Sequence, residues 1–379
     1  MFSKGGLAKL PILLLVLLPT ASTFLTPSPA LRAPSAALHL RSKSSVQGGR
    51  RSSTRGGFIA VRSQFGGLFS IGGGGGGAGQ TVDPAKFSFF SDKSGGREPV
   101  ASWASEAGRD KGKAKRNQDA AVCGQVAGLN VFAVFDGHGA SGHLVAEYLV
   151  DHIAAALDYS LGNPGASADF AVSEAFTVAD GWVSQVLGAA AIEQSGATGT
   201  VVLQKGTSLL VASVGDSRAV LGSAAKGATM VLTTDHNPAS PIEKARIEAA
   251  GGTVGDFRGE PDMAISGQGR VFIKGKQFPG LATARAFGDG MGKTVGVSSE
   301  PDITCVTRGS SQTVLVIASD GVWDVMDDED AVETALGFAS SRDAATAAAV
   351  IVEAARMLWE TRPGSERRID DITACVAFF

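Results

Sequence analysis

The sequence predicts an α+β fold in which antiparallel β-sheets are flanked by helices. Short β-type runs follow one another with turns that are too short for the helical crossover that parallel neighbours would need. Longer segments with apolar residues at helical spacing lie between and after these runs. A chain of 379 residues has ample apolar material for the core of such a fold.

The β-type runs are short, apolar and bounded by polar turns. They cover residues 131–135, 201–203, 208–214, 217–221 and 313–318. The final residues, 372–379 (ITACVAFF), alternate weakly, which suits a last strand that enters a sheet.

Four segments have the apolar spacing of helices. They are 140–158, 168–190, 240–250 and 341–360, and the second and fourth are rich in alanine and amphipathic. Helices of this kind place one apolar face on a neighbouring layer, so we expect them to cover the sheets.

The charge is distributed unevenly between the two ends of the chain. The first 82 residues contain nine Lys or Arg and no acid, which leaves 25 basic against 37 acidic residues in the remainder, a net charge of about −12. A nucleic-acid-binding protein concentrates its positive charge in the folded part, so no nucleic-acid partner is expected. An acidic body favours divalent cations.

The three cysteines, Cys123, Cys305 and Cys375, lack the paired spacing of a disulfide framework or a zinc site. Buried free thiols in a reducing compartment are the expected interpretation.

The first residues have the layout of a targeting signal. The apolar run 10–18 follows two lysines and precedes small residues, as in a signal peptide, and it is too short to span a membrane. We therefore expect a signal-peptide-like segment at 1–25 and no stable membrane association. A membrane anchor remains the alternative.

Residues 26–90 are expected to form a transit peptide and a glycine-rich linker without fixed structure, followed by the folded domain at 91–379. Residues 26–65 are rich in Ser, Arg, Ala and Gly and lack acids, as transit peptides do. The six-glycine run 72–77 has no following Lys-Ser or Lys-Thr, so it indicates a flexible linker rather than a phosphate loop.

The junction Ala21 to Phe24 resembles the cleavage motif of algae whose plastids lie behind an extra endomembrane. These signals in series predict delivery to a plastid. The secretory pathway and the cytosol are the alternatives.

The first motif that carries chemistry is VFDGHG at 134–139. An apolar strand ends at Asp136, and Gly137 lets the backbone turn so that its carbonyl and the carboxylate face one point, which suits a hard cation. An ordinary Asp-Gly hairpin turn explains the motif equally well. His138 alone is typical of a structural histidine.

The second motif, VLVIASDGVWDV at 314–325, repeats this arrangement with Asp320 and, four residues later, Asp324. Two carboxylates at the ends of buried strands repel each other unless a cation lies between them. A bound metal removes this conflict.

More carboxylates occupy similar strand or loop ends. They are Asp119, Asp216 and the neighbours Asp370 and Asp371. Together with the two motifs they form an all-oxygen set, which favours Mg²⁺ or Mn²⁺ over Zn²⁺ or copper. No organic cofactor is expected.

Nine motifs follow one another along the chain: NQD, VFDGHG, SGATGT, VGDSRA, LTTDHNP, PGLATARAFGD, SEPD, ASDGVWDV and DDIT. In this order they resemble those of the metal-dependent Ser/Thr protein phosphatases of type 2C (PPM-type), and the resemblance covers residues 105–379. It implies two packed antiparallel sheets with helices on both outer faces, a four-layer sandwich. It also implies hydrolysis of phosphoserine and phosphothreonine on phosphorylated protein substrates, and we expect a monomer.

The resemblance also implies roles for single residues. Asp136 and the carbonyl of Gly137, with Asp320 and Asp370, would hold two Mg²⁺ or Mn²⁺ ions, and Asp119 would reach them through water. Asp216 and Asp324 match a weaker third site. A water activated by the two metals attacks phosphorus, and His138 protonates the leaving oxygen as a general acid.

One position departs from the family pattern. Ala114 stands five residues before Asp119, where the family usually has an arginine that binds the substrate phosphate. Lys113, Lys115 and Arg116 crowd the same segment and are the candidates for that contact, although lysine lacks the bidentate fork of arginine. A solvated basic face is the alternative.

Two other functions are weighed against this one. Residues 288–294 read GDGMGKT, but the spacing does not match a nucleotide-binding P-loop. A catalytically weak or silent phosphatase-like module that binds phosphoproteins is the remaining alternative, and it depends on the missing arginine.

Overall fold

The computed structural model describes residues 80–82, 98–224, 228–256, 269–363 and 368–379. The segment 1–25 lies outside the described residues, and so does the expected linker apart from Gln80–Val82, which forms strand β1. In the part of the chain that is described, no helix is both long enough and apolar enough to cross a membrane.

The larger sheet contains eight described strands. They follow the order β1-β16-β9-β8-β6-β7-β15, with β5 paired to β6, and every pairing is antiparallel. The bounds are β1 Gln80–Val82, β5 Asp119–Val126, β6 Leu129–His138, β7 Gly196–Ala197, β8 Gly199–Lys205, β9 Ser208–Val214, β15 Phe287–Gly288 and β16 Asp302–Thr307.

The second sheet is also antiparallel and has the order β11-β10-β17-β19-β2. Its strands are β2 Val100–Glu106, β10 Arg218–Ser223, β11 Thr229–Val231, β17 Gln312–Ala318 and β19 Ile372–Phe378. Two small three-stranded sheets have the orders β12-β13-β14 and β18-β3-β4. Their strands are β3 Arg109–Asp110, β4 Lys113–Ala114, β12 Gly252–Gly255, β13 Arg270–Ile273, β14 Pro279–Leu281 and β18 Arg368–Ile369.

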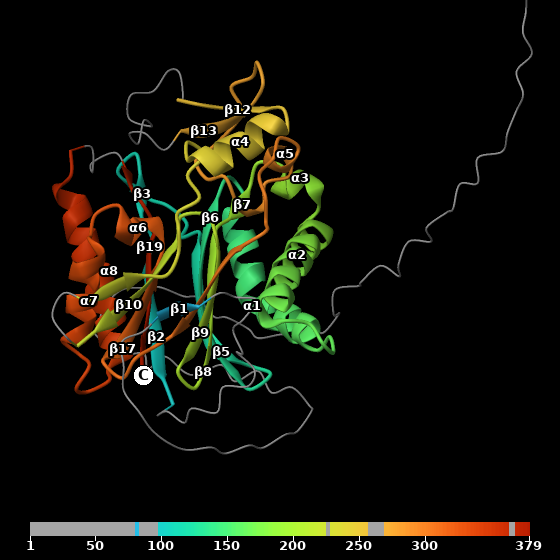
Figure 1. Ribbon diagram of the computed structural model, residues 1–379. Helices are drawn as coiled ribbons and strands as arrows, with labels where there is room; N and C mark the ends of the chain where they lie inside the picture. The colour runs from blue at the N-terminus through green and yellow to red at the C-terminus, as the bar shows by residue number, and fades with distance from the viewer. Residues whose placement is uncertain (1–79, 83–97, 225–227, 257–268, 364–367) are drawn as a thin grey trace, which may run out of the picture. The chain divides into compact units, whose positions relative to one another are not determined.

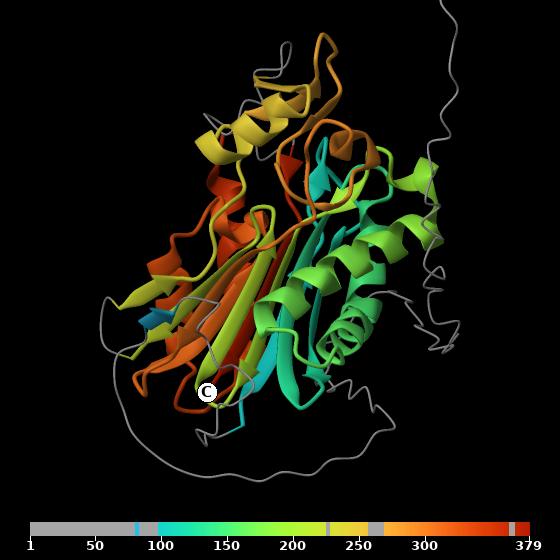
Figure 2. The ribbon, with the colours of Figure 1, turned by 45° about the vertical axis from the view of Figure 1, so that its right-hand side comes forward.

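Helices cover the outer face of each large sheet (Figures 1 and 2). The long helices α1 (Gly142–Leu161) and α2 (Ala168–Leu187) lie on the first sheet, and α7 (Asp328–Leu336) and α8 (Ala344–Thr361) lie on the second. The remaining helices are α3 Ala189–Ile192, α4 Pro241–Ala249, α5 Gly290–Lys293 and α6 Asp320–Trp323. The expected four-layer sandwich is confirmed.

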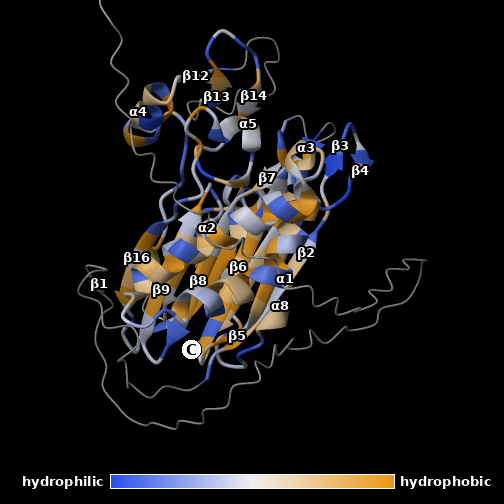
Figure 3. Ribbon diagram, turned by 90° about the vertical axis from the view of Figure 1, so that its right-hand side faces the viewer, coloured by the Kyte–Doolittle hydropathy of each residue, from blue (hydrophilic) through white to orange (hydrophobic). Residues whose placement is uncertain are grey.

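The central strands are buried on both faces, which explains their continuous apolar sequences. On β6, Ala133 and Phe135 contact the helices α1 and α2, whereas Phe132 and Val134 pack into the layer between the sheets. The same alternation on β17 divides its side chains between the inner layer and the α7/α8 side. Figure 3 shows the predominantly hydrophobic strands behind α1 and α2, whose ribbons mix hydrophobic and hydrophilic residues.

Candidate functional site

The hairpin of β5 and β6 places two carboxylates side by side at the end of the larger sheet. A tight turn with positive φ at Ala127 and Gly128 sets the register, and this register puts Asp119 directly opposite Asp136. Opposed residues in such a ladder have Cβ atoms about 4.5–5.5 Å apart. Both aspartates remain partly exposed to solvent.

The second motif reaches the same place from the other sheet. Asp320 begins α6 directly after β17, and the backbone N–H of Asp324 donates to the Asp320 carbonyl at 2.8 Å. The hydroxyl of Ser319 donates to Asp119 Oδ2 at 2.7 Å. The ends of β17 and β5 therefore meet across the two sheets, as the pairing of the motifs predicts.

The glycine after each of these aspartates allows close backbone approach. A Cβ on Gly137 would lie 2.4 Å from the Gly142 carbonyl oxygen, and a Cβ on Gly321 would lie 1.9 Å from that of Asp371. These contacts leave no room for a side chain. The Asp-Gly pairs are thus requirements of packing at the meeting point of the sheets, rather than hairpin turns.

Burial and mutual repulsion both act on the cluster of Asp119, Asp136, Asp216 and Asp320. Burial, followed by the charges of neighbouring carboxylates, raises the pKa of Asp136 and of Asp320 well above the usual value. Burial also raises the pKa of Asp119 to about 7 and that of Asp216 to about 6. The group therefore lies in a strongly negative field.

These residues fit a hard divalent cation by their chemistry. All the donors are oxygens, they repel one another, and Asp119 Oδ1 is buried without a hydrogen-bond partner among the described residues. Within those residues, no group of three or more His, Cys, Asp or Glu side chains forms a ready metal site. The fit depends on donor type and charge, and no preformed coordination geometry supports it.

Asp370 and Asp371, between β18 and β19, differ from each other. Asp371 is buried and accepts hydrogen bonds from the backbone N–H groups of Gly108 at 2.7 Å and Gln118 at 2.9 Å. Asp370 instead contacts Lys115 Nζ at 2.9 Å and Arg368 Nη2 at 2.7 Å. Burial would raise the pKa of Asp370, but these two cations outweigh burial and lower it.

The three basic candidates from the sequence lie in different surroundings. Lys115 lies at the carboxylates, 2.9 Å from Asp370 and 3.1 Å from Asp371. Arg116 is exposed and pairs with Glu147 of α1 at 3.1 Å, and Lys113 is exposed on β4. Sequence reasoning missed Arg368, although it stands only two residues before its partner Asp370.

His138 has a partner that the sequence did not suggest. Its Nε2 lies 2.6 Å from Oδ2 of Asp289. Burial lowers the pKa of His138, but the charge and hydrogen bond of Asp289 outweigh burial, so the pKa is raised. Asp289 is the last residue of the motif PGLATARAFGD, and its place in that motif was the one sequence feature that could have marked it as a site residue.

The Gly-Lys-Thr run, residues 292–294, lies at the short helix α5 and its C-terminal end. Gly288 ends the two-residue strand β15, and the helix that follows, α5, has four residues. Lys293 forms an ion pair with Asp180 of α2. This lysine anchors a loop, in agreement with the exclusion of a P-loop.

Comparison with known proteins agrees with the resemblance seen in the sequence. The family model described as Protein phosphatase 2C matches residues 109–358. Probable protein phosphatase 2C 72 of Arabidopsis thaliana is 34% identical over 279 residues, which are 69% of this chain and 81% of that protein. Probable protein phosphatase 2C 12 of Oryza sativa subsp. japonica is 32% identical over 76% of this chain and 82% of that protein.

A solved structure shares the fold. The serine-threonine phosphatase 2C from Toxoplasma gondii superposes with a TM-score of 0.62 at 25% identity, over 74% of this chain and 94% of that one. Phosphatases of this family act on phosphorylated proteins and depend in general on Mg²⁺ or Mn²⁺. The chain belongs to the protein phosphatase 2C family and is a metal-dependent protein serine/threonine phosphatase.

Proposed function

We propose that this chain hydrolyses phosphoserine and phosphothreonine at a binuclear Mg²⁺ or Mn²⁺ centre between the ends of the two sheets. The observation that carries the proposal is the pair Asp136 and Asp320. Each comes from a different sheet, and burial together with the charges of neighbouring carboxylates holds the pKa of both carboxyls well above normal. Two cations would remove this repulsion.

The ligands would come from four segments of the chain. Asp136, the Gly137 carbonyl, Asp320 and Asp370 would hold the two ions, with Asp119 acting through water. A weaker third ion would lie at Asp216 and Asp324, since both carboxylates raise the pKa of their neighbours and Asp324 is among the causes of the raised Asp216 pKa. When bound, the ions would lower the pKa of the attacking water and neutralise the phosphate oxygens.

The chain's own residues would position the phosphate and move the proton. Of the three basic candidates, Lys115 is the one in contact with the carboxylates, so it is proposed to attract the phosphate as a point charge. His138 would protonate the departing serine or threonine oxygen. Lys113 and Arg116 would contribute a weaker positive field at the rim.

Titration of the purified chain with Mn²⁺ and with Mg²⁺, followed by phosphate release from a phosphothreonine peptide, tests the centre. We expect two strong binding events and turnover that chelator abolishes. Asp136→Asn should lose strong binding and turnover together. A folded, metal-loaded chain without turnover would contradict the proposal and favour a phosphoprotein-binding module.

We also propose delivery to a plastid, supported by the signal-like run 10–18 and the acid-free segment 26–65. Residues 1–65 fused to a fluorescent protein should enter the plastid of an alga with an extra plastid envelope, and Phe24→Ala should retain the fusion outside it. Cytosolic fluorescence of the unaltered fusion would contradict the proposal.

A further inference from the structure

We propose that Asp289 is a positioning residue for His138, which it holds with one ring nitrogen engaged and the other free to deliver a proton to the leaving oxygen. This inference rests on the proposed general-acid role of His138. It adds a second residue, 151 positions later in the chain, to the proton-transfer step.

The contact between the two side chains is short, and the two side chains differ in their exposure to solvent. His138 Nε2 lies 2.6 Å from Asp289 Oδ2, and the side chains are 27% and 3% exposed respectively. The carboxylate is therefore enclosed by protein, while the imidazole opens to solvent. A carboxylate accepts hydrogen bonds only, so it fixes the ring proton on Nε2 and leaves Nδ1 as the accessible nitrogen.

The backbone at Asp289 is held in an uncommon conformation. Its φ of 48° and ψ of 51° lie in the left-handed region, which costs a non-glycine residue about 1 kcal/mol or more. The backbone N–H of Asp289 donates to the Ser195 carbonyl at 2.9 Å. Conformations of this kind persist where the surroundings determine them and concentrate at functional sites.

Strand pairing connects the two residues directly. Strand β15 pairs with β7, and β7 pairs with β6, so that Gly288, Gly196 and His138 lie at matching positions of neighbouring strands. Asp289 follows Gly288 at once and is therefore carried to the histidine by the sheet. Its place does not depend on a free loop.

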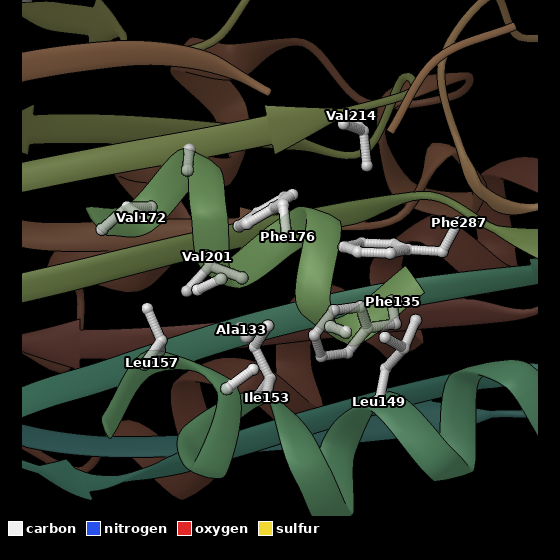
Figure 4. Packing of buried hydrophobic residues seen from close by; sticks show 14 of the residues in the cluster. Ala133, Phe135, Leu149, Ile153, Leu157, Val172, Phe176, Val201, Val214 and Phe287 are labelled. Carbon is white, nitrogen blue, oxygen red and sulfur yellow. The ribbon is translucent and has the colours of Figure 1, made fainter. Parts of the chain in front are cut away.

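The aromatic core fixes β15 from the other side. Phe287 packs on Phe135 of β6 with ring centroids 6.2 Å apart and on Phe176 of α2 at 5.1 Å, as Figure 4 shows. Asp180 of α2 accepts a hydrogen bond from the Gly288 N–H at 2.7 Å and pairs with Lys293. The segment on both sides of Asp289 is thus anchored.

The Asp289 carboxylate occupies space that is open because residue 196 is a glycine. A Cβ on Gly196 would lie 2.3 Å from Asp289 Oδ2. Any larger residue at 196 would displace the group that touches His138. The packing of Phe287, the backbone conformation of Asp289 and the pairing of β15 with β7 therefore all fix the position of this carboxylate.

In the reaction, the oxygen of the attacking water forms a bond to phosphorus and this water gives up a proton. The bond between phosphorus and the serine or threonine oxygen breaks, and its electron pair goes to that oxygen. The oxygen takes the proton from Nδ1 of His138. The ring then regains a proton that originates from the attacking water, and Asp289 stays ionised throughout, stabilising the charged ring before transfer. An orienting carboxylate of this kind acts through geometry and tautomer.

The test exploits how strongly each leaving group needs the proton. We expect Asp289→Asn to lower kcat on a phosphothreonine peptide by about 10- to 100-fold and kcat on p-nitrophenyl phosphate by under about threefold, because nitrophenolate leaves without full protonation. Asparagine tolerates the left-handed conformation, so the loop should persist. Equal losses on both substrates would overturn the inference.

A double variant and a matched control sharpen the outcome. His138→Gln should show the same substrate pattern, and adding Asp289→Asn to it should cost little more. Asp302→Asn makes the same exchange beside another histidine, since Asp302 Oδ2 lies 3.2 Å from His236 Nε2, and it should affect both substrates in parallel. Additive losses in the double variant would overturn the inference.

A readout without metal completes the test. In the metal-free protein, the His138 Nε2 proton should give a downfield, exchange-protected NMR signal that Asp289→Asn removes. Its presence in the variant would contradict the contact. Failure of the binuclear centre differs from all these results, because the unaltered chain would then lack metal-dependent turnover on either substrate.

Discussion

The carboxylates of the site fall into two groups that differ in how their negative charge is compensated. On one side, Asp136 and Asp320 repel each other and the pKa of each carboxyl is far above normal. On the other side, Lys115 and Arg368 neutralise Asp370 and lower its pKa. The charge of Arg368 also acts on Asp136 and Asp320, but the pKa of both carboxyls stays raised, so the first side is the one that depends on an added cation.

This difference separates the requirements of activity from those of stability. Burying like charges costs free energy, and the chain retains that cost at Asp136 and Asp320. At Asp371 two backbone N–H groups and a lysine satisfy the carboxylate. Substitutions at Asp136 and Asp320 should therefore change activity more than stability. A substitution at Asp371 should change stability more than activity.

The largest effect is expected for Asp136→Asn. Removing a bridging ligand should lower phosphate release by about 10³-fold or more, as for other residues that assemble a catalytic unit. The same change should stabilise the metal-free protein by about 1–3 kcal/mol, because it removes a buried charge from a repulsive cluster. Kinetics on a phosphothreonine peptide and denaturant unfolding with chelator measure the two effects. A destabilised metal-free variant would contradict the repulsion.

The second effect concerns pH. The folded-state pKa of Asp119 is about 7 and that of Asp216 about 6, both above the usual value of 3.8 for an aspartate. A carboxyl with a raised folded pKa contributes stability that is complete below pH 4 and lost as the pH rises through 6 and 7. The metal-free protein should thus lose a few kcal/mol between about pH 4 and 7.

Saturating Mg²⁺ should reduce or reverse this loss, because the cation replaces the protons. Thermal unfolding across this pH range, with and without Mg²⁺, checks the sign. A metal-free melting temperature that climbs steadily between about pH 4 and 7 would show that the pKa values of these carboxyls are not raised in the folded protein.

Much of the fold could be predicted from the sequence, because strands buried on both faces give continuous apolar runs. The residues 131–135 and 313–318 lie in β6 and β17, and the expected helices correspond to α1, α2, α4 and α8. The two Asp-Gly motifs were recognisable for the same reason. A hairpin turn explained the first motif equally well, so the repetition of the pattern and the order of the nine motifs were needed to interpret it.

The remaining site residues could not be found this way, because long-range pairing creates them. Asp289 matters only after β15 pairs with β7 beside β6. Arg368 differs, because it contacts Asp370 two residues later, and that nearness in the sequence was an available signal. The different surroundings of Asp370 and Asp371 depend on which side chain meets the Gly108 and Gln118 amides, and adjacent identical residues give no local signal for that choice.

The third effect compares those two neighbours. Asp371→Asn should destabilise the protein by about 1–3 kcal/mol, because one of two buried amides loses its acceptor. Asp370→Asn should change stability less and weaken Mn²⁺ binding more. Denaturant unfolding and metal titration of both variants provide the comparison. Equal effects on metal affinity would remove the distinction between the two residues.

The smallest effect concerns the basic residues beside the carboxylates, Lys115 and Arg116. Lys115→Gln should raise KM for a phosphothreonine peptide about tenfold, a change of about 1.4 kcal/mol, because it removes the cation that touches the carboxylates. Arg116→Gln removes the same charge from an exposed pair with Glu147, and exposed pairs contribute under about 1 kcal/mol, so KM should change less than twofold. Inhibition by inorganic phosphate should weaken in parallel with KM for Lys115→Gln alone. If Arg116→Gln gave the larger change, the phosphate contact would lie on the α1 side of the rim, away from Asp370.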